Sequence, residues 1–442
     1  MSEISQAGGT LGAGDRNRSL TYIFGLMLLV GFGSPAAGLV DVPITFFLKN
    51  KLHLPAHEVA NFRLVAAIPL YVGFLFGFAR DRWDILGRKD RGMMMVFASV
   101  CAAAYAGFAF VPVSYPMLMA AVALSAVAWS FARAAEQGLA SMAGQQLAVT
   151  GWMSVIWSMA ASVPYLGAYL IGGALSQALE GRTAEQAART LFLVAAGVMG
   201  AMALYSAWKP KFLYSHLKAE AHADRPLQDL ARLFRHWPVY PALAVWFLWS
   251  FAPGSGTALQ FHMQNTLHAS DTQWGAWNAI FAAAFIPTYL VYGALCRRFT
   301  ARTLLFWGTA VGIPQMVPLY FIHSVDQAMW AAAVIGLTGG VASAAYIDLL
   351  MRSAPKALQG TIMMTAGSLY WVAIRFGDVL GTRLYEQAGG FGACVIAITV
   401  VYALIVPVLL TVPRSLIATR EGEVLPLEEP ALEVGAQETL HA

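Results

Sequence analysis

Twelve apolar runs, each long enough to cross a bilayer as a helix, dominate this sequence. A transmembrane helix needs about 20 consecutive, mostly apolar residues. Hydrophobic residues make up 58% of the chain and charged residues only 12%, whereas soluble domains contain about 25% charged residues. We therefore expect an all-α, multi-pass membrane protein. The predicted spans are residues 20–47, 58–79, 91–112, 116–139, 151–177, 187–208, 238–263, 273–296, 303–322, 327–350, 358–385 and 391–412.

The basic residues of the loops predict how these spans are oriented. Loops that follow even-numbered spans are basic, whereas those that follow odd-numbered spans carry few basic residues apart from Lys49 and Lys51. Because basic loops remain on the cytoplasmic side, both termini should be cytoplasmic, in what we expect to be a bacterial inner membrane. The basic segments are 80–91, 209–235, 297–302 and 352–356.

The spans divide into two halves of six. The longest internal loop, 209–237, contains a helical apolar periodicity that predicts an amphipathic helix on the membrane surface. Residues 46–53 end the first span and residues 261–268 end the seventh, and both read Phe-x-x-x-Asn-x-Leu-His. This echo at equivalent positions indicates a parallel duplication. We expect a polar tail at 1–19, helix bundles at 20–208 and 238–413, and an acidic, disordered tail at 414–442.

The densest charge cluster lies between the second and third spans, in the segment 77–91, GFARDRWDILGRKDR. Its Gly-x-x-x-Asp-Arg start and later Gly-Arg-Lys resemble the loop between spans 2 and 3 of the major facilitator superfamily. In that superfamily the Asp and Arg clamp neighbouring helix ends and help to hold one transport state. The alternative is an ordinary basic cytoplasmic loop. The residues that carry the resemblance are Gly77, Asp81, Arg82, Gly87, Arg88 and Lys89.

A narrower resemblance, to the folate–biopterin transporter family, is spread over both halves. It is carried by residues 44–50 with 54–59, by 247–257 and by 354–361, while Gly73 stands where that family tends to carry Lys. Muropeptide permeases and bacteriochlorophyll-assembly carriers are near relatives of that family. The resemblance implies the major facilitator fold of two six-helix bundles, acting by alternating access on a small organic, anionic or planar solute.

Protons are the expected coupling ion, and a monomer is the expected oligomeric state. One alternative is a muropeptide or amino-sugar permease of the same fold. An alternative of another class is a membrane assembly factor or sensor that does not transport. The sequence shows no nucleotide-binding loop, metal-ligand spacing or nucleophilic triad, so we expect no enzyme activity, catalytic residue, metal, cofactor or nucleic-acid partner.

Charged residues inside a span are costly unless they line a cavity or find a partner, so they are candidates for a substrate or proton pathway. Arg375 and Asp378 lie three residues apart in span 11 and can neutralise each other, and Trp371 could stack on a planar ligand. The same spacing allows a pair in span 4. The candidates are Asp41, Arg63, Arg133, Glu136, Trp371, Arg375 and Asp378.

Several of these residues also have structural interpretations. Asp41 could reach water at the outer surface, and Arg63 could extend to the outer interface. Asp348 and Arg352, at the inner end of span 10, are predicted to clamp helix ends as an i,i+4 pair. Pro253, Gly254 and Gly256 should interrupt span 7, as a hinge or as a simple packing kink.

Overall fold

The computed structural model describes residues 12–35, 39–40, 43–44, 47–48, 52–54, 56–217, 234–387 and 389–423, and every regular element within these ranges is helical. Eight α-helices lie in the described part of the first half of the chain. They are α1 (Ala13–Phe32), α3 (Ala56–Ala66), α4 (Ile68–Tyr71), α5 (Gly73–Arg82), α6 (Lys89–Phe108), α7 (Tyr115–Gln146), α8 (Thr150–Glu180) and α9 (Ala184–Ala207).

The short helix α10 (Lys211–Tyr214) follows, and the second half begins after it. A π-helical turn (His262–Thr266) continues α13, and a 3₁₀ turn (Val317–Phe321) follows α15. The helices are α12 (Val239–Ser250), α13 (Thr257–Phe261), α14 (Asp271–Leu295), α15 (Ala301–Gly312), α16 (Val325–Ser353), α17 (Gln359–Gln387), α18 (Phe391–Ala403), α19 (Ile405–Leu410) and α20 (Arg414–Ile417).

Five of these helices begin at a Ser or Thr side chain. In each case the hydroxyl oxygen accepts a hydrogen bond from the backbone amide three residues later, which satisfies one of the unpaired N–H groups of the first turn. Before α14 the contact is reciprocal, because the side chain of Gln273 also accepts from the amide of Ser270. The capping residues are Ser114, Thr183, Ser270, Thr300 and Ser324.

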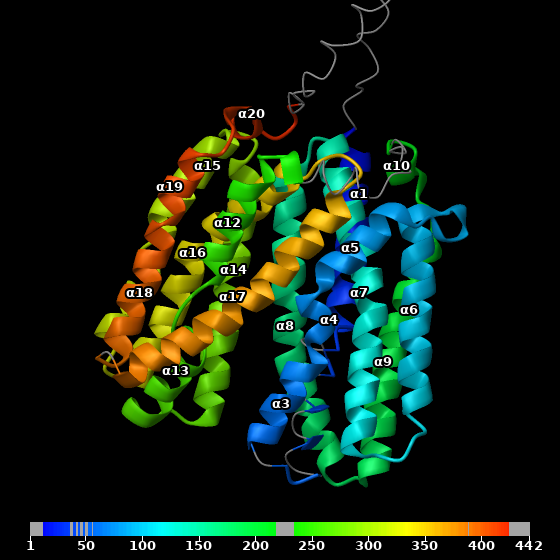
Figure 1. Cartoon of the computed structure of the whole chain (residues 1–442), viewed down its shortest axis with the longest axis vertical. Helices are drawn as coiled ribbons and strands as arrows, with labels where there is room; N and C mark the ends of the chain where they lie inside the picture. The colour runs from blue at the N-terminus through cyan, green and yellow to red at the C-terminus, as the bar shows by residue number, and fades with distance from the viewer. Residues whose placement is uncertain are drawn as a thin grey trace, which may run out of the picture.

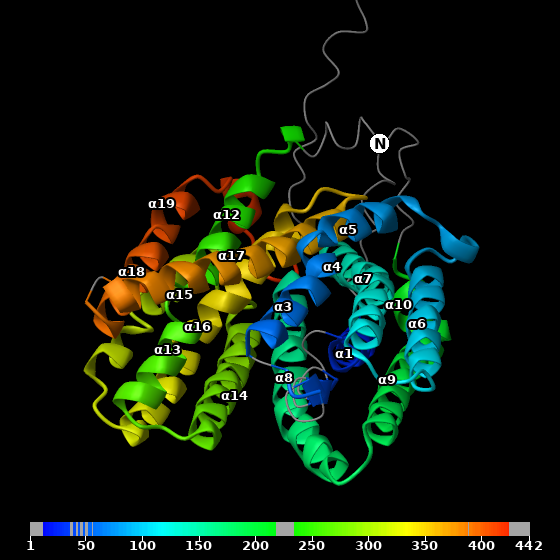
Figure 2. The same ribbon diagram turned by 60° about the horizontal axis from the view of Figure 1, so that its bottom comes forward.

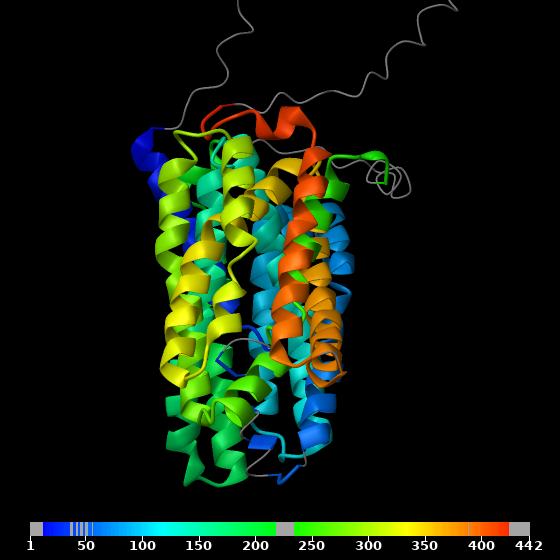
Figure 3. The same cartoon turned by 90° about the vertical axis from the view of Figure 1, so that its left-hand side faces the viewer.

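The helices form two groups that lie side by side, one from each half of the chain (Figure 2). They run along the long axis of the molecule (Figure 3). Helices α10 and α20 lie at one end, here called the α10/α20 end, and α3 and α13 lie towards the other, the α3/α13 end (Figure 1). Helix α17 runs obliquely between the groups and packs on α4, α5 and α7, while α8 packs on α14 and α16. These contacts form the interface between the halves.

Within the described residues, seven helical segments are long and apolar enough to cross a membrane. They comprise α6, α7, α9, α14, α15 with its 3₁₀ turn, α16, and α18 with α19. Helices α1, α3 to α5, α8, α12 to α13 and α17 occupy the other predicted spans. A multi-pass membrane protein is thus supported, whereas the total of twelve spans and the cytoplasmic termini remain predictions.

Three predicted boundaries differ from the structure or lie outside it. Helix α1 begins at Ala13, so the first helix extends into the expected polar tail. The amphipathic helix expected in the loop 209–237 falls largely on residues outside the described ranges. The expected disordered tail starts with a folded segment, because residues 414–423 contain α20 and contact both halves.

The repeated Phe-x-x-x-Asn-x-Leu-His motif has matching backbone features in both halves at the positions that the structure describes. The amide of Leu52 donates to the carbonyl of Phe47, and the amide of Leu267 donates to that of His262, which are pairs at the same offset (262 − 47 = 215). His53 and His268 have left-handed φ angles of 53° and 57°. The two span ends are therefore structural equivalents, as a duplication predicts.

Candidate functional site

The carboxylate of Asp81, at the end of α5, lies against the first turn of α17 from the other half. Its Oδ2 accepts hydrogen bonds from the amide and hydroxyl of Thr361 at 2.7 and 2.6 Å, and its Oδ1 accepts from the amide of Gly360 at 3.1 Å. The first amides of a helix lack intrahelical partners and form the positive end of the helix dipole, so they stabilise a carboxylate. This contact joins the two halves at the α10/α20 end.

Arg80 neutralises the buried Asp81 and ties it to the next helix. Its guanidinium donates to Oδ1 of Asp81 at 2.7 Å and to both oxygens of Asp90, at the start of α6, at 2.5 and 2.6 Å. All three residues are buried. Arg80 and Asp90 were not among the predicted site residues, because the family motif directs attention to the Asp-Arg dipeptide that follows.

The other basic residues of this loop contact residues of the first half. The guanidinium of Arg82 lies over the ring of Phe78, 4.4 Å from its centroid, and Arg88 lies 3.9 Å from the sulfur of Met95. The amide of Lys89 donates to Asp84, and Gly87 provides a positive φ of 62° in the turn. Asp81 is the predicted loop residue whose side chain binds the start of α17.

Two glycines allow α5 and α17 to approach this closely. A Cβ atom on Gly77 would overlap the carbonyl oxygen of Gly360. A Cβ on Gly360 would lie 2.7 Å from Oδ1 of Asp81. Gly77 of the predicted loop set therefore serves the helix crossing that brings Asp81 to α17.

A second contact joins the halves beside Asp81. Nε2 of Gln145, at the end of α7, donates to the carbonyls of Met351 at 2.6 Å and Ala354 at 2.8 Å. Its Oε1 accepts from Gln359 at 3.0 Å. Neither glutamine was predicted to be a site residue, because a neutral side chain at a helix end forms no recognisable sequence motif.

The predicted ion pair at the end of α16 is present. Nε of Arg352 lies 2.8 Å from Oδ1 of Asp348, and the hydroxyl of Tyr292 donates to the other carboxylate oxygen at 2.8 Å. Nη1 of Arg352 also donates to the hydroxyl of Thr419, beyond α20, at 2.8 Å. The pair thus joins α14, α16 and the C-terminal segment, all within the second half.

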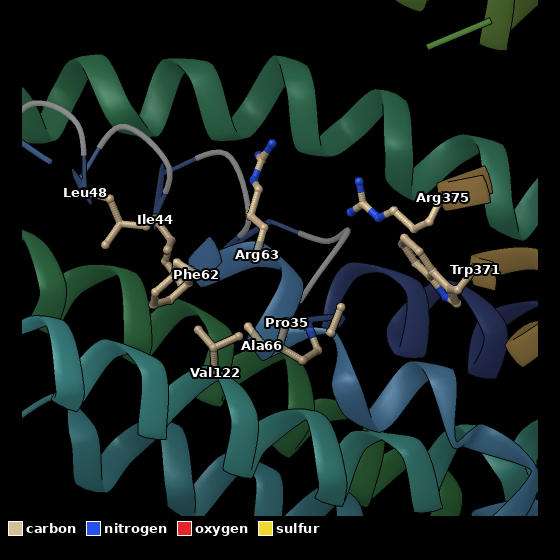
Figure 4. A pocket seen from close by; sticks show the side chains of 10 residues that line it. Pro35, Ile44, Leu48, Phe62, Arg63, Ala66, Val122, Trp371 and Arg375 are labelled. Carbon is tan, nitrogen blue, oxygen red and sulfur yellow. The ribbon is translucent and has the colours of Figure 1, made fainter. Parts of the chain in front are cut away.

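A cavity of about 120 Å³ lies between the halves, towards the α3/α13 end. Arg63 from α3 and Arg375 from α17 both extend their guanidinium groups on one side of it, and Trp371 lies beside Arg375 (Figure 4). No acidic side chain occurs among its described lining residues. Asp41, a predicted pathway residue, lies outside the described residues. The cavity brings together three of the seven predicted pathway residues and presents positive charge to its contents.

The expected pair between Arg375 and Asp378 is absent: although both residues lie in the described part of α17, no ion pair joins them. Oδ1 and Oδ2 of Asp378 accept instead from the amide and the hydroxyl of Thr257, each at 2.7 Å. Thr257 is the first residue of α13, and the first amides of a helix lack intrahelical acceptors. The carboxylate of Asp378 therefore binds this helix start instead of Arg375. Arg375 is thereby left to face the cavity.

The predicted interruption of span 7 explains how Thr257 reaches Asp378. Helix α12 ends at Ser250 and α13 begins at Thr257, so residues 251–256 break the helix. A Cβ on Gly381 would overlap the backbone of Gly254, and Gly256 lies against the carboxylate of Asp378. The run that includes Pro253, Gly254 and Gly256 therefore packs closely on α17. Its action as a hinge remains a prediction.

Arg133 and Glu136 on α7 also differ from the expected pair. Arg133 lies 4.9 Å from the ring centroid of Trp129, and Gln137, with its amide oxygen turned inward, accepts from it at 3.0 and 3.1 Å. No ion pair joins Arg133 to Glu136, although both are described. Oε1 of Glu136 is buried without a hydrogen-bond partner. Thus Gln137, whose i,i+4 spacing matches Arg133 better, takes the guanidinium.

Comparison with known proteins identifies relatives of this chain in sequence and in fold. The sequence profile of the Major Facilitator Superfamily matches residues 27–382. No curated protein sequence matches the chain. A bacterial homologue of the iron transporter ferroportin, in an outward-facing state, has a TM-score of 0.66 at 17% identity, with 89% of this chain and 98% of that one covered.

Two further structures share the fold at similarly low identity. The human organic anion transporter MFSD10 has a TM-score of 0.63 at 15% identity, covering 89% of this chain and 99% of that one. The proton:xylose symporter XylE has a TM-score of 0.64 at 14% identity, covering 90% and 96%. Because the superfamily profile extends over most of the sequence, the chain belongs to the major facilitator superfamily.

Proposed function

We propose that the protein is a secondary active transporter of a small organic anion. The observation that carries this proposal is the pair of arginines, one from each half, that line one cavity. Guanidinium groups bind carboxylates and phosphates through charge-assisted, often bidentate hydrogen bonds. An anion held by Arg63 and Arg375 would contact both halves at once, as a solute must if its binding is to change how the halves are arranged.

Trp371 supports a planar solute. Its indole lies beside Arg375 at the cavity (Figure 4), so a flat ring could stack on it while an acidic substituent reaches the guanidinium. This arrangement agrees with the anionic, planar solute that the folate–biopterin resemblance implies. The name of the MFSD10 structure, an organic anion transporter, is compatible with the same solute class.

The positions at which the halves are joined support alternating access. Asp81 and Gln145 bind the opposite half at the α10/α20 end, whereas the cavity lies towards the α3/α13 end. The basic loops predict that the α10/α20 end is cytoplasmic. The arrangement then corresponds to a form closed on the cytoplasmic side, and release of the solute requires the Asp81 contact to break.

Glu136 is the group best suited to couple this cycle to protons. Its Oε1 is buried without a hydrogen-bond partner, and ionisable groups inside a span are typical of proton pathways. After deprotonation, Arg133 could leave Gln137 and pair with it. Asp378 is less suited, because both of its oxygens are already engaged by hydrogen bonds from Thr257.

The alternatives make different demands on the cavity. A membrane assembly factor could have an apolar groove or a closed centre, and neither needs two converging arginines. A neutral amino sugar requires neutral hydrogen-bonding groups more than positive charge, whereas a muropeptide carries carboxylates that the two arginines could also bind. The cavity therefore favours transport of an anion over an assembly factor and over a neutral amino sugar, and a muropeptide falls within the proposed class of anions.

A thermal-shift experiment on purified protein tests the proposal. Folate, which is planar and anionic, should raise the melting temperature, because a ligand that binds only the folded state at about 100 times its Kd adds about 2.7 kcal/mol of stability. Arg375→Ala should abolish the shift. Arg383→Ala, an exposed arginine on the same helix outside the cavity, is the matched control and should retain it.

If Arg375→Ala keeps the full shift, the cavity is not the binding site. If folate and a series of simple aromatic carboxylates and organic phosphates all fail, while neutral sugars stabilise the protein, the assignment of an anionic solute is wrong.

A further inference from the structure

A short segment beyond the last long helix lies across the α10/α20 end of the molecule. It comprises residues 414–423, with α20 and the turn that follows it, and is here called the C-terminal strap (Figure 1). Three contacts attach it to the second half. Thr419 accepts from Nη1 of Arg352 at 2.8 Å and, through its carbonyl, from the amide of Ala301 at 3.2 Å, and the amide of Glu421 donates to the carbonyl of Cys296 at 3.1 Å.

The same strap also binds the first half. The amide of Gly422 donates to the carbonyl of Ala148, in the turn between α7 and α8, at 2.9 Å. Oε2 of Glu421 accepts from the amide of Trp152 at 2.9 Å. A Cβ on Gly151 would lie only 2.5 Å from this oxygen, so the glycine makes room for the carboxyl group. Two consecutive strap residues thus hold the start of α8.

The chemistry of this contact matches that of Asp81. Trp152 lies in the first turn of α8, where the amides lack intrahelical partners. As at Asp81, a carboxyl group from the other half of the chain accepts a hydrogen bond from one of these amides. Cys296, at the end of α14, donates its thiol to the same oxygen at 3.2 Å. Glu421 therefore sits where α8 of the first half meets α14 of the second.

We propose that the C-terminal strap is a latch that holds α8 against α14 and must release α8 before the α10/α20 end can open. The strap is continuous with the second half and bound to it by Arg352, Ala301 and Cys296, so it leaves with that half when the two separate. Breakage then falls on the bonds to Ala148 and Trp152. This proposal concerns the motion of the halves and needs no assumption about the solute.

The latch is also sensitive to pH. Burial raises the pKa of the Glu421 carboxyl from its ordinary value of 4.5 to about 7; Asp348 adds to the rise, whereas the donating Cys296 thiol and Trp152 amide and the charge of Arg297 oppose it. On the α16 side, Asp348 is itself paired with Arg352. A protonated carboxyl keeps one oxygen free to accept from Trp152, so protonation preserves the contact while removing the cost of a buried charge.

The sign of the dependence follows from proton binding. The latched form binds the proton more tightly than a released glutamate in water, so release becomes easier as pH rises wherever only the latched form is protonated. The latch is strongest below pH 4.5, weakens between 4.5 and about 7, and is weakest above that. Lower pH therefore favours the closed α10/α20 end.

Distances between spin labels test the latch directly in the full-length protein. One pair of labels, on Arg420→Cys and Lys209→Cys, measures the distance between the strap and the first half. A second pair, on Lys209→Cys and Lys356→Cys, measures the distance between the two halves. All three positions are exposed, whereas the native cysteines are buried. Glu421→Ala should raise the long-distance population of both pairs about tenfold, as expected for the loss of a hydrogen bond to a carboxyl group.

Two further variants make the test specific. Glu421→Gln keeps an acceptor oxygen but cannot titrate, so its distances should stay short and equal at pH 6 and pH 8, whereas the native protein should open more at pH 8. Glu423→Ala is the matched control and should behave as native, because this exposed glutamate accepts from the amide of Arg420 within the strap.

Opening of the second pair without lengthening of the first would show that the strap need not release. Unchanged distances in Glu421→Ala would remove Glu421 from the latch. A pH response that persists in Glu421→Gln would overturn the assigned pH sensor. None of these results depends on the solute, so they are independent of the thermal-shift test above.

Discussion

Asp81 and Asp378 make nearly the same contact in two different places. Each accepts from the amide and the hydroxyl of a threonine that follows a glycine at the start of a helix, Thr361 for Asp81 and Thr257 for Asp378. The four distances lie between 2.6 and 2.7 Å. Asp81, however, binds a helix of the other half, whereas Asp378 binds a helix of its own half. The same arrangement of groups can therefore form a contact that breaks when the halves separate, or one that remains intact within a half.

The surroundings of the two aspartates fit this difference. Asp81 is buried and has Arg80 beside it, which in turn is held by Asp90, so positive charge remains available when α17 moves away. Asp378 is half-buried, and the helix start at Thr257 is its charge partner. Because the break before α13 leaves the amide of Thr257 without an intrahelical acceptor, we expect Asp378 to keep this contact throughout the transport cycle.

The largest expected effect comes from locking the end that Asp81 holds. A Cβ on Gly151 would lie 2.8 Å from the sulfur of Cys296 in the other half, close enough for Gly151→Cys to form a disulfide after the flexible Glu421 side chain moves aside. Oxidation should abolish transport in proteoliposomes, and a reductant should restore it.

Gly151→Cys in a Cys296→Ser background is the matched control and should transport equally well with and without oxidant. Full transport by the oxidised, cross-linked protein would mean that this end does not open, and Asp81 would then be as permanent a contact as Asp378.

Asparagine substitutions should separate the two aspartates. Hydrogen bonds to a charged group contribute about 1.5–3 kcal/mol, roughly twice the value of neutral ones. Asp378→Asn should lower the free energy of unfolding by about 2 kcal/mol, measured by thermal melting, because its contact exists in every state. Asp81→Asn should lower it less and instead shift the halves towards opening at the α10/α20 end, measured by label distances.

The comparison fails if Asp378→Asn changes the distances between the halves as much as Asp81→Asn does. It also fails if Asp81→Asn melts earlier than Asp378→Asn while the distances remain those of the native protein.

The smallest expected effects come from the two threonine hydroxyls. Thr361→Val and Thr257→Val each remove one hydrogen bond of about 1 kcal/mol while keeping the shape of the side chain. Thr361→Val should raise the ratio of open to closed molecules at the α10/α20 end about fivefold, measured by label distances. Thr257→Val should lower the melting temperature and leave that ratio unchanged. Thr382→Val, on α17 away from Asp81, is the matched control, because the hydroxyl of Thr382 donates to the carbonyls of Asp378 and Val379 in its own helix.

The predictions from sequence succeeded where the controlling interaction is local or repeated. Runs of apolar residues predict helices because each must satisfy its backbone hydrogen bonds within the bilayer. At its described positions, the motif at 46–53 and 261–268 has the same backbone hydrogen bond and the same left-handed histidine, since the residues that the two segments share lie at equivalent helix ends. The ion pair of Asp348 and Arg352 formed because its i,i+4 spacing needs only one helix.

The partner of each remaining charge was decided by the tertiary structure. Spacing places Arg375 and Asp378 on one face of α17, but Thr257, 121 residues away, takes the carboxylate. The sequence places Glu421 in an acidic tail, yet its carboxyl group accepts a hydrogen bond from an amide of α8, 269 residues away. The unpaired amides of a helix start attract a carboxylate wherever the fold brings the two together. Which helix start arrives depends on the packing of the two halves, and that information is absent from local sequence patterns.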